Sequence, residues 1–112
     1  MEFSETRQDG ALILGIRGEV DSTTSPELEE KLIGLIESGE RRFVLDFEGV
    51  DYVSSAGFRV LLKTIKDLKP KGGSLHVCSV KDYIKEVFDV SGFNAVIPLH
   101  GTVDESLKAL AC

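Results

Sequence analysis

The chain has 112 residues, which suits one domain of ordinary size, at roughly 100 to 200 residues each, and we expect that domain to span residues 1–112. Thirteen lysines and arginines against 19 aspartates and glutamates give a net charge of −6, so direct binding to nucleic-acid phosphates or anionic lipid is not expected. No apolar run reaches the length of a membrane span, and the acidic start lacks the positive charge of a secretory signal. The sequence therefore predicts a cytoplasmic protein.

The first half of the chain predicts a hairpin, a helix and a strand. Residues 3–8 alternate in polarity and residues 11–16 are apolar, with Asp9-Gly10 as a turn between them. Ser25-Pro26-Glu27 is typical of a helix start, and Gly39 can end that helix. A strand is expected at Phe43–Leu45, and the acidic stretch 46–51 is expected to be a loop that leads towards Ser54.

The second half predicts three helices and two further strands. Apolar residues at helical spacing indicate one buried face for each helix: Phe58, Leu61, Leu62, Ile65 and Leu68 for the first; Ile84, Val87 and Phe88 for the second; Val103, Leu107 and Leu110 for the third, with Thr102 or Asp104 as its cap. Strands are expected at Ser74–Cys78 and at Ala95–Ile97.

The predicted order of elements is ββαβαβαβα, which favours an α/β fold with one central mixed sheet and four helices. After the opening hairpin the strands should be mostly parallel, because helices connect them. The loops that follow parallel strands gather at the carboxyl ends of the strands, where open α/β sheets usually place functional residues. Functional side chains are therefore expected at these strand-to-helix junctions.

The junction at Ser54-Ser55-Ala56-Gly57 carries two hydroxyl groups at a predicted helix start. Ser54 is placed to cap the helix, and Ser55 then lies in the first turn, where free N–H groups and the helix dipole favour an added anion. A phosphate on Ser55 would carry about −1.5 to −2 charges there. The alternative is that both serines only cap and turn the chain.

Three segments of the sequence resemble the STAS domains, and among them the small bacterial anti-sigma factor antagonists. They are Gly18–Asp21, Val44–Gly57 and Val87–Phe93, so the resemblance spans essentially the whole chain. The resemblance implies a STAS fold, and it places the phosphorylated residue at Ser55. Ser54 stands where many members of the family have an acid.

The resemblance also implies partners and a switch. The unphosphorylated form would bind an anti-sigma factor that is a serine kinase and so free a sigma factor for transcription, and a PP2C-type phosphatase would reverse the modification. The expected partner-binding residues are Asp21, Ser54, Ser55, Ala56, Gly57 and Arg59. Asp21 could instead form an Asx turn, and Arg59, four residues after Ser55, could reach a phosphate or be simply solvated.

Other kinds of site find little support in the sequence. His76 and His100 are 24 residues apart with no companion cluster, so no metal is expected, and Cys78 and Cys112 lack CxxC spacing, so both should be free thiols. No Gly-x-Ser-x-Gly elbow supports an enzyme, and no Walker-type loop supports the weak nucleotide binding that parts of the family suggest. No cofactor is expected.

One alternative function stays open at the level of sequence. The same surface could serve an unphosphorylated docking subunit of a signalling or lipid-transport complex, in place of the phosphorylated switch. For the oligomeric state, we expect a monomer or a weak dimer.

Overall fold

Five strands form one mixed sheet in which each strand lies beside its neighbour in the sequence. The computed structural model describes residues 1–111. The strands are β1 (Glu2–Gln8), β2 (Ala11–Val20), β3 (Arg42–Val53), β4 (Ser74–Cys78) and β5 (Leu99–His100). The β1–β2 pair is antiparallel and the other pairs are parallel, as the sequence predicts. The β1–β2 turn has positive φ at Asp9 and Gly10, which is typical of a tight hairpin.

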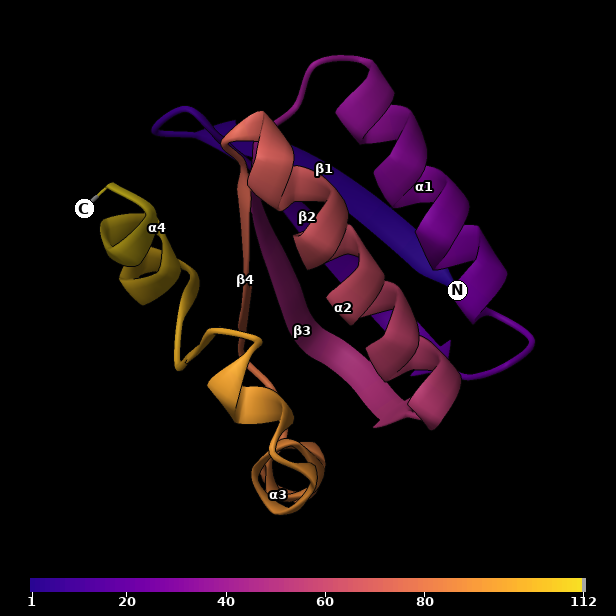
Figure 1. Cartoon of the computed structure of the whole chain (residues 1–112). Helices are drawn as coiled ribbons and strands as arrows, with labels where there is room; N and C mark the ends of the chain where they lie inside the picture. The colour runs from indigo at the N-terminus through magenta and orange to yellow at the C-terminus, as the bar shows by residue number, and fades with distance from the viewer. Residues whose placement is uncertain (112) are drawn as a thin grey trace.

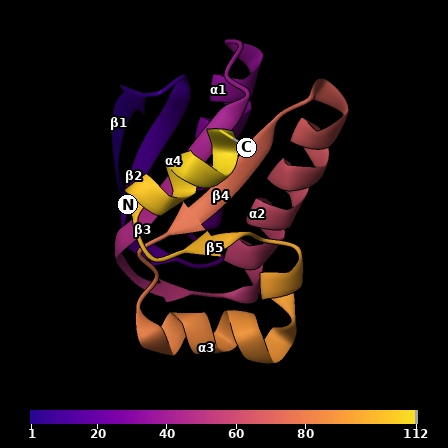
Figure 2. The same cartoon turned by 90° about the vertical axis from the view of Figure 1, so that its left-hand side faces the viewer.

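The helices cover both faces and one end of the sheet. α1 (Ser25–Glu37) and α2 (Ser55–Leu68) lie side by side on one face (Figure 1). α4 (Val103–Ala111) covers the other face, and α3 (Asp82–Ser91) lies across one end, below α2 and β5 in Figure 2. Short 3₁₀ turns follow α2 and α3 at Lys69–Lys71 and Phe93–Ala95. No helix within residues 1–111 is long and apolar enough to cross a bilayer.

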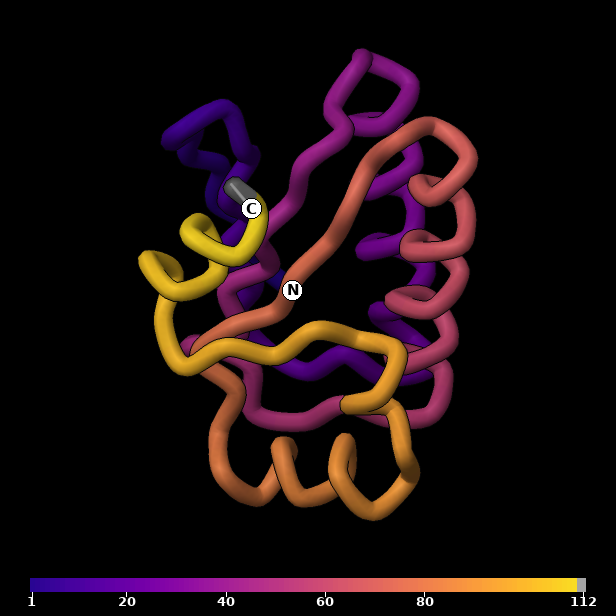
Figure 3. Tube along the Cα trace, turned by 60° about the vertical axis from the view of Figure 1, so that its left-hand side comes forward, coloured from indigo at the N-terminus to yellow at the C-terminus, as the bar shows by residue number. Residues whose placement is uncertain are grey.

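The alternation of β3 divides the core between the two faces of the sheet. Phe43, Leu45 and Phe47 are fully buried in the larger core, which α1 and α2 complete. Val44 faces the opposite way and packs with Cys78 and α4. Because successive strand side chains point to opposite faces, one apolar segment supplies both layers. The Cα trace in Figure 3 shows α1 and α2 on one side of β3 and β4 and α4 on the other.

The expected loop at residues 46–51 is wrong, because these residues continue β3, which runs to Val53. The parallel pairing of β2 with β3 runs from Leu12↔Phe43 to Val20↔Val53. It contains two register shifts, between Gly15 and Arg17 and between Gly18 and Glu19 of β2. Such bulges let a strand take up extra residues and bend, so an acidic, glycine-containing stretch can stay in the sheet.

Two expectations for the second half of the chain are also wrong. The last strand is β5 at Leu99–His100, whereas the expected segment, 95–97, ends a 3₁₀ turn and exposes Val96. Periodicity alone cannot assign such a short apolar run. Val87, expected on the buried face of α3, is exposed, whereas Ile84 and Phe88 are buried. The Thr102 hydroxyl accepts a hydrogen bond from the Glu105 N–H (3.1 Å) and so caps α4 as expected.

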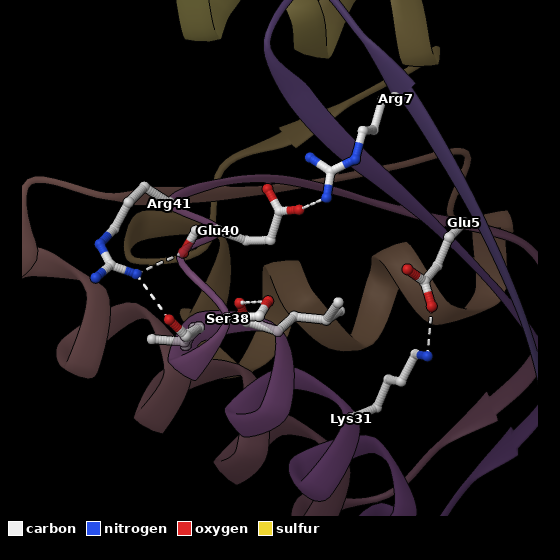
Figure 4. Close-up of polar contacts among 8 residues, drawn as sticks. Glu5, Arg7, Lys31, Ser38, Glu40 and Arg41 are labelled. Carbon is white, nitrogen blue, oxygen red and sulfur yellow. Dashed lines mark hydrogen bonds and ion pairs between the residues drawn. The ribbon is translucent and has the colours of Figure 1, made fainter.

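Ion pairs tie the edge strand β1 to α1 and to the segment that follows it (Figure 4). Glu5 pairs with Lys31 of α1, and Arg7 pairs with Glu40. Next to them, Arg41 Nη1 donates to the carbonyl oxygens of Ile36 (2.9 Å) and Glu40 (2.8 Å), which satisfies a carbonyl at the end of α1. Partly exposed pairs of this kind each contribute little to stability, so they mainly position β1.

The two histidines, far apart in the sequence, meet where β5 joins the sheet. His76 Nδ1 and His100 Nε2 lie 2.8 Å apart, so one proton links the two rings. This bond needs at least one neutral imidazole, because two protonated rings have no acceptor. Partial burial, and then the charge of His100, lower the pKa of His76. The folded protein therefore binds a proton at His76 less tightly than the unfolded chain does.

The histidine pair predicts a loss of stability in mild acid. The unfolded state takes up the His76 proton first, so the free energy of unfolding should fall as the pH drops below about 6.5 and on through the lower folded-state pKa. Urea unfolding at several pH values between about 8 and about 5.5 measures this change. His76→Gln, which cannot titrate, should lose less stability over that range. Equal losses in the two proteins would contradict the assignment to His76.

The buried face of α2 predicts a contrast between two adjacent leucines. Leu61 is fully buried, whereas Leu62, which the sequence pattern also places in the core, is half-buried. Leu61→Ala should therefore cost about 2 to 5 kcal/mol of unfolding free energy, and Leu62→Ala clearly less. Chemical denaturation of both variants measures the difference, and equal costs would mean that the helix face is assigned wrongly.

Candidate functional site

The Ser54–Gly57 segment lies at the carboxyl edge of the sheet, where β2 and β3 end together. Val20 and Val53 are register partners at the ends of these strands. Immediately beyond them, the Ser54 N–H donates to the Val20 carbonyl oxygen (2.8 Å). This bond places the start of α2 beside the turn that begins at Asp21. Two segments that are more than 30 residues apart in the sequence thus form one surface.

The two serines have opposite environments. Ser55 is the first residue of α2 and is exposed. Ser54 has the extended backbone of a cap residue, but its hydroxyl oxygen is buried and has no hydrogen-bond partner among the described residues. The expected position of Ser54 at the helix cap is confirmed, although its side chain makes no capping bond. Of the two serines, only Ser55 is exposed to solvent.

The N-terminus of α2 is open toward Ser55. The first helical hydrogen bond runs from the Phe58 N–H to the Ser54 carbonyl oxygen (3.1 Å). The N–H groups of the three residues before Phe58 point out of the helix end, as in any α-helix, and give this end partial positive charge. A negative group attached to Ser55 would lie near this charge.

Gly57 allows α2 to approach β2 closely. A Cβ atom at this position would lie 2.9 Å from the Val20 carbonyl oxygen and 2.7 Å from Val20 Cγ1. Distances below 3.0 Å are not seen for real Cβ atoms, so any larger residue would push the helix away from the strand. Gly57 is therefore a packing requirement of the site.

Asp21 lies beside this junction and organises the turn before α1. Its Oδ1 accepts hydrogen bonds from the N–H groups of Thr24 (3.0 Å) and Thr23 (2.9 Å). These two bonds, that of Thr24 foremost, lower the pKa of the Asp21 carboxyl group, so Asp21 is ionised at neutral pH. The Asx-turn alternative is thus the observed geometry. Oδ2 accepts none of the bonds found within residues 1–111, so one oxygen of Asp21 can still meet a partner.

Arg59 is exposed on α2, one turn after Ser55. Residues four apart share one face of a helix, so the guanidinium group can turn toward a group attached to Ser55. In the part of the chain that the structure describes, Arg59 forms no ion pair. It is therefore available to a phosphate or to a partner.

Sequence reasoning missed Lys81 and Tyr83, which fasten the start of α3 to the end of β3. Lys81 Nζ donates to the carbonyl oxygens of Glu48 (2.9 Å) and Val50 (3.1 Å) and lies 3.3 Å from Asp51 Oδ1. The Tyr83 hydroxyl donates to the Asp51 carbonyl oxygen (2.6 Å). The signal was available, because the loop after β4 must lie at the same edge as the loop after a parallel β3.

A groove on the sheet lies away from Ser55. It has a volume of about 820 Å³ and lies between β1, β2 and β3. Its lining includes Arg17 together with Glu2, Asp46 and Glu48. Neither Ser54 nor Ser55 lines this groove, so it is separate from the exposed hydroxyl at the start of α2.

The remaining reactive groups do not form a second centre in the described residues. No group of three or more metal-ligating side chains occurs there. Cys78 is a free, buried cysteine, and burial is the main cause of its raised pKa, so it is a thiol rather than a reactive thiolate at neutral pH. The other cysteine, Cys112, lies outside the described residues.

Comparison with known proteins identifies relatives along the whole chain. The model of the STAS domain matches residues 3–106. The chain is 40% identical over 109 residues to BtrV, a candidate anti-sigma factor antagonist of Bordetella bronchiseptica, covering 97% of this chain and 94% of that one. It is 32% identical over 92 residues to the anti-sigma-B factor antagonist of Staphylococcus aureus, covering 82% and 85%.

A solved structure shows the same fold. The anti-sigma factor antagonist from Mycobacterium paratuberculosis has a TM-score of 0.89 to this chain at 23% sequence identity, covering 99% of this chain and 94% of that one.

The different surroundings of Gly57 and Gly34 predict opposite effects when each is replaced by alanine. Gly57→Ala should lower the free energy of unfolding by about 1 to 3 kcal/mol, because the methyl group has no room against Val20. Gly34, inside α1, has no atom within 4 Å of its absent Cβ, so Gly34→Ala should raise stability by about 0.5 to 1 kcal/mol. Thermal and urea unfolding of both variants test this contrast. A neutral Gly57→Ala would show that α2 does not need the close approach.

Proposed function

Because the chain belongs to the STAS domain family, we propose that it is an anti-sigma factor antagonist whose binding is switched by phosphorylation of Ser55. In this proposal the unphosphorylated protein binds an anti-sigma factor that is a serine kinase, and a sigma factor is released for transcription. Two relatives that are 40% and 32% identical and carry anti-sigma factor antagonist names support the role. The expected compartment, the cytoplasm, and the expected monomer or weak dimer stay predictions.

One observation carries the choice of residue: Ser55 is exposed at the start of α2, whereas the hydroxyl of Ser54 is buried. A kinase must bring the γ-phosphate of ATP to the attacking hydroxyl group, so the acceptor has to project from the surface. Ser55 meets this condition without any rearrangement of the fold. Ser54 would have to leave its buried position first.

The proposed modification is an ordinary phosphoryl transfer. The Ser55 oxygen forms a bond to the γ-phosphorus of ATP, the bond to the β-phosphate oxygen breaks, and the hydroxyl proton passes to a base of the kinase. ADP leaves. A PP2C-type phosphatase would reverse the change by hydrolysis, which returns the serine and releases inorganic phosphate.

The added phosphate would alter the surface more than the fold. It brings about −1.5 to −2 charges to the start of α2, where the helix N–H groups and Arg59 can receive it. The neighbouring surface already holds the ionised Asp21. A partner shaped to fit the neutral hydroxyl would then meet a bulky, charged group at the centre of the contact, so the complex should dissociate although both proteins stay folded.

Two substitutions at Ser55 test the switch. The protein is incubated with ATP and with a histidine-kinase-like anti-sigma factor encoded by a neighbouring gene. Mass spectrometry of the intact protein should then show one added phosphate on the wild type and none on Ser55→Ala. Ser54→Ala is the matched control and should be phosphorylated normally. Ser55→Asp should keep its far-UV circular dichroism and bind this kinase at least about tenfold more weakly than the wild type, which corresponds to about 1.4 kcal/mol.

Other outcomes would point elsewhere. A phosphate mapped to Ser54 would overturn the choice of residue. A kinase that binds the protein but never modifies it would favour the constitutive docking subunit of a signalling or lipid-transport complex. Loss of helix in Ser55→Asp would identify unfolding, rather than surface charge, as the cause of weaker binding.

A further inference from the structure

The outward side of α3 carries an apolar row that the fold does not bury. Ile84 and Phe88 form the inner side, and the Phe88 ring packs edge-on against Phe58 of α2 with ring centroids 4.7 Å apart. Tyr83, Val87 and Val90 lie on the outer side and are 54%, 45% and 83% exposed. Their spacing of four and three residues puts them on one face of the helix. Single exposed apolar residues are common, but a contiguous row of them marks an interaction surface.

An acidic row runs directly beside this apolar row. Asp82, Glu86 and Asp89 each precede one of the exposed apolar residues by one position, and all three are exposed. None of them takes part in an ion pair within residues 1–111, and the one side-chain bond of Asp89 is from the neutral Asn94 amide (2.9 Å). We name the two rows together the α3 outer face. Glu86 joins Tyr83, Val87 and Val90 in lining a shallow groove of about 320 Å³ there.

Within residues 1–111, neither of the nearest lysines forms an ion pair with the acids of this face. Lys81 is engaged at the end of β3, where it contacts Glu48, Val50 and Asp51. Lys85 follows Asp82 by three residues and precedes Asp89 by four, so it borders the acidic row on the side away from the apolar row and offsets only part of the charge of the three acids. The α3 outer face therefore offers an apolar stripe with negative charge along one side.

We propose that the α3 outer face binds a basic amphipathic helix of a partner protein. Apolar side chains of that helix would cover Tyr83, Val87 and Val90, and its lysines or arginines would meet Asp82, Glu86 and Asp89. Helix-in-groove binding uses this combination of spaced apolar anchors and flanking charges. The charge also disfavours other occupants, because a second copy of this chain would bring the same acidic row and a net charge of −6, and anionic lipid would be repelled.

The α3 outer face is distinct from the Ser55 surface but lies at the same edge of the sheet. The Tyr83 hydroxyl bonds to the carbonyl oxygen of Asp51, four residues before Ser55, and α3 crosses this end of the molecule below the start of α2 (Figures 1 and 2). One partner could therefore contact both surfaces, or two partners could use them separately. The binding proposed here needs neither phosphorylation nor the kinase.

Titration with a synthetic peptide tests the proposal on the full chain. The probe is a fluorescent amphipathic peptide of about 18 residues, or five helical turns, with leucines on one face and lysines on its flanks. A second peptide carries glutamate in place of each lysine. The lysine peptide should bind and should weaken with added salt, and the glutamate peptide should not bind. In the ¹⁵N-labelled protein, the amide shifts that change should centre on residues 82–91.

Matched substitutions separate this face from the overall charge. Glu86→Lys should weaken peptide binding about tenfold, whereas Glu37→Lys, an identical charge change at an exposed site on α1, should change it less than about twofold. Val90→Ser should weaken binding about threefold or more, whereas Val96→Ser, at another exposed valine, should not. Ser55→Asp should also leave peptide binding unchanged within about twofold, which keeps this result independent of the proposed switch.

Three results would overturn the proposal. The first is no binding of the lysine peptide up to about 1 mM, the weakest affinity of interest here. The second is an equal loss in Glu86→Lys and Glu37→Lys, which would mean attraction to net charge alone. The third is a set of shift changes centred on the groove between β1, β2 and β3, which would assign the peptide to that acidic surface instead. Circular dichroism of each variant confirms that these exposed substitutions leave the helices intact.

Discussion

The close approach of α2 to the end of β2 is the constraint on which the candidate site depends. The Ser54 N–H reaches the Val20 carbonyl oxygen, and Gly57, one turn further on, leaves no side chain between helix and strand. Together these two contacts position the start of α2 against the end of β2. The same constraint buries one hydroxyl and exposes the next, so a backbone contact decides which serine another protein can reach.

A second group of contacts holds α3 at this edge of the sheet through apolar packing and side-chain hydrogen bonds. Phe88 and Phe58 bury apolar area between two helices, and Lys81 satisfies carbonyl oxygens where β3 bends. Ser55 takes no part in either contact, so a charge could be added there without loss of support for the fold. The α3 outer face carries three acids and would select a partner with a basic surface. The proposed change at Ser55 acts differently, because it puts a bulky charged group where a partner fits a neutral hydroxyl.

The errors of sequence reasoning all fall where distant segments compete for the same backbone or side chain. The acidic end of β3 has the composition of a loop, but its N–H and C=O groups find partners on β2, and bulges absorb the extra residues. The apolar triplet at 95–97 has the composition of a strand, yet β4 pairs with Leu99 and His100 instead. Val87 has the spacing of a core residue, but Ile84 and Phe88 are the residues that α3 buries, with Phe88 packed against Phe58 of α2. Composition and spacing indicate whether a residue favours a loop, a strand or the core. The neighbours available in the folded protein decide which of these it adopts.

For the site itself, the sequence determined the local features and the tertiary structure decided the environment. Serine hydroxyls at a helix start and a glycine two residues later follow from the order of residues, since capping, helix dipole and backbone freedom are local properties. The burial of the Ser54 hydroxyl, the position of Asp21 beside it and the reach of Lys81 to Asp51 depend on segments that are about 30 residues apart. Such contacts exist only after the parallel strands have aligned, because the sheet brings the carboxyl ends of its strands to one edge.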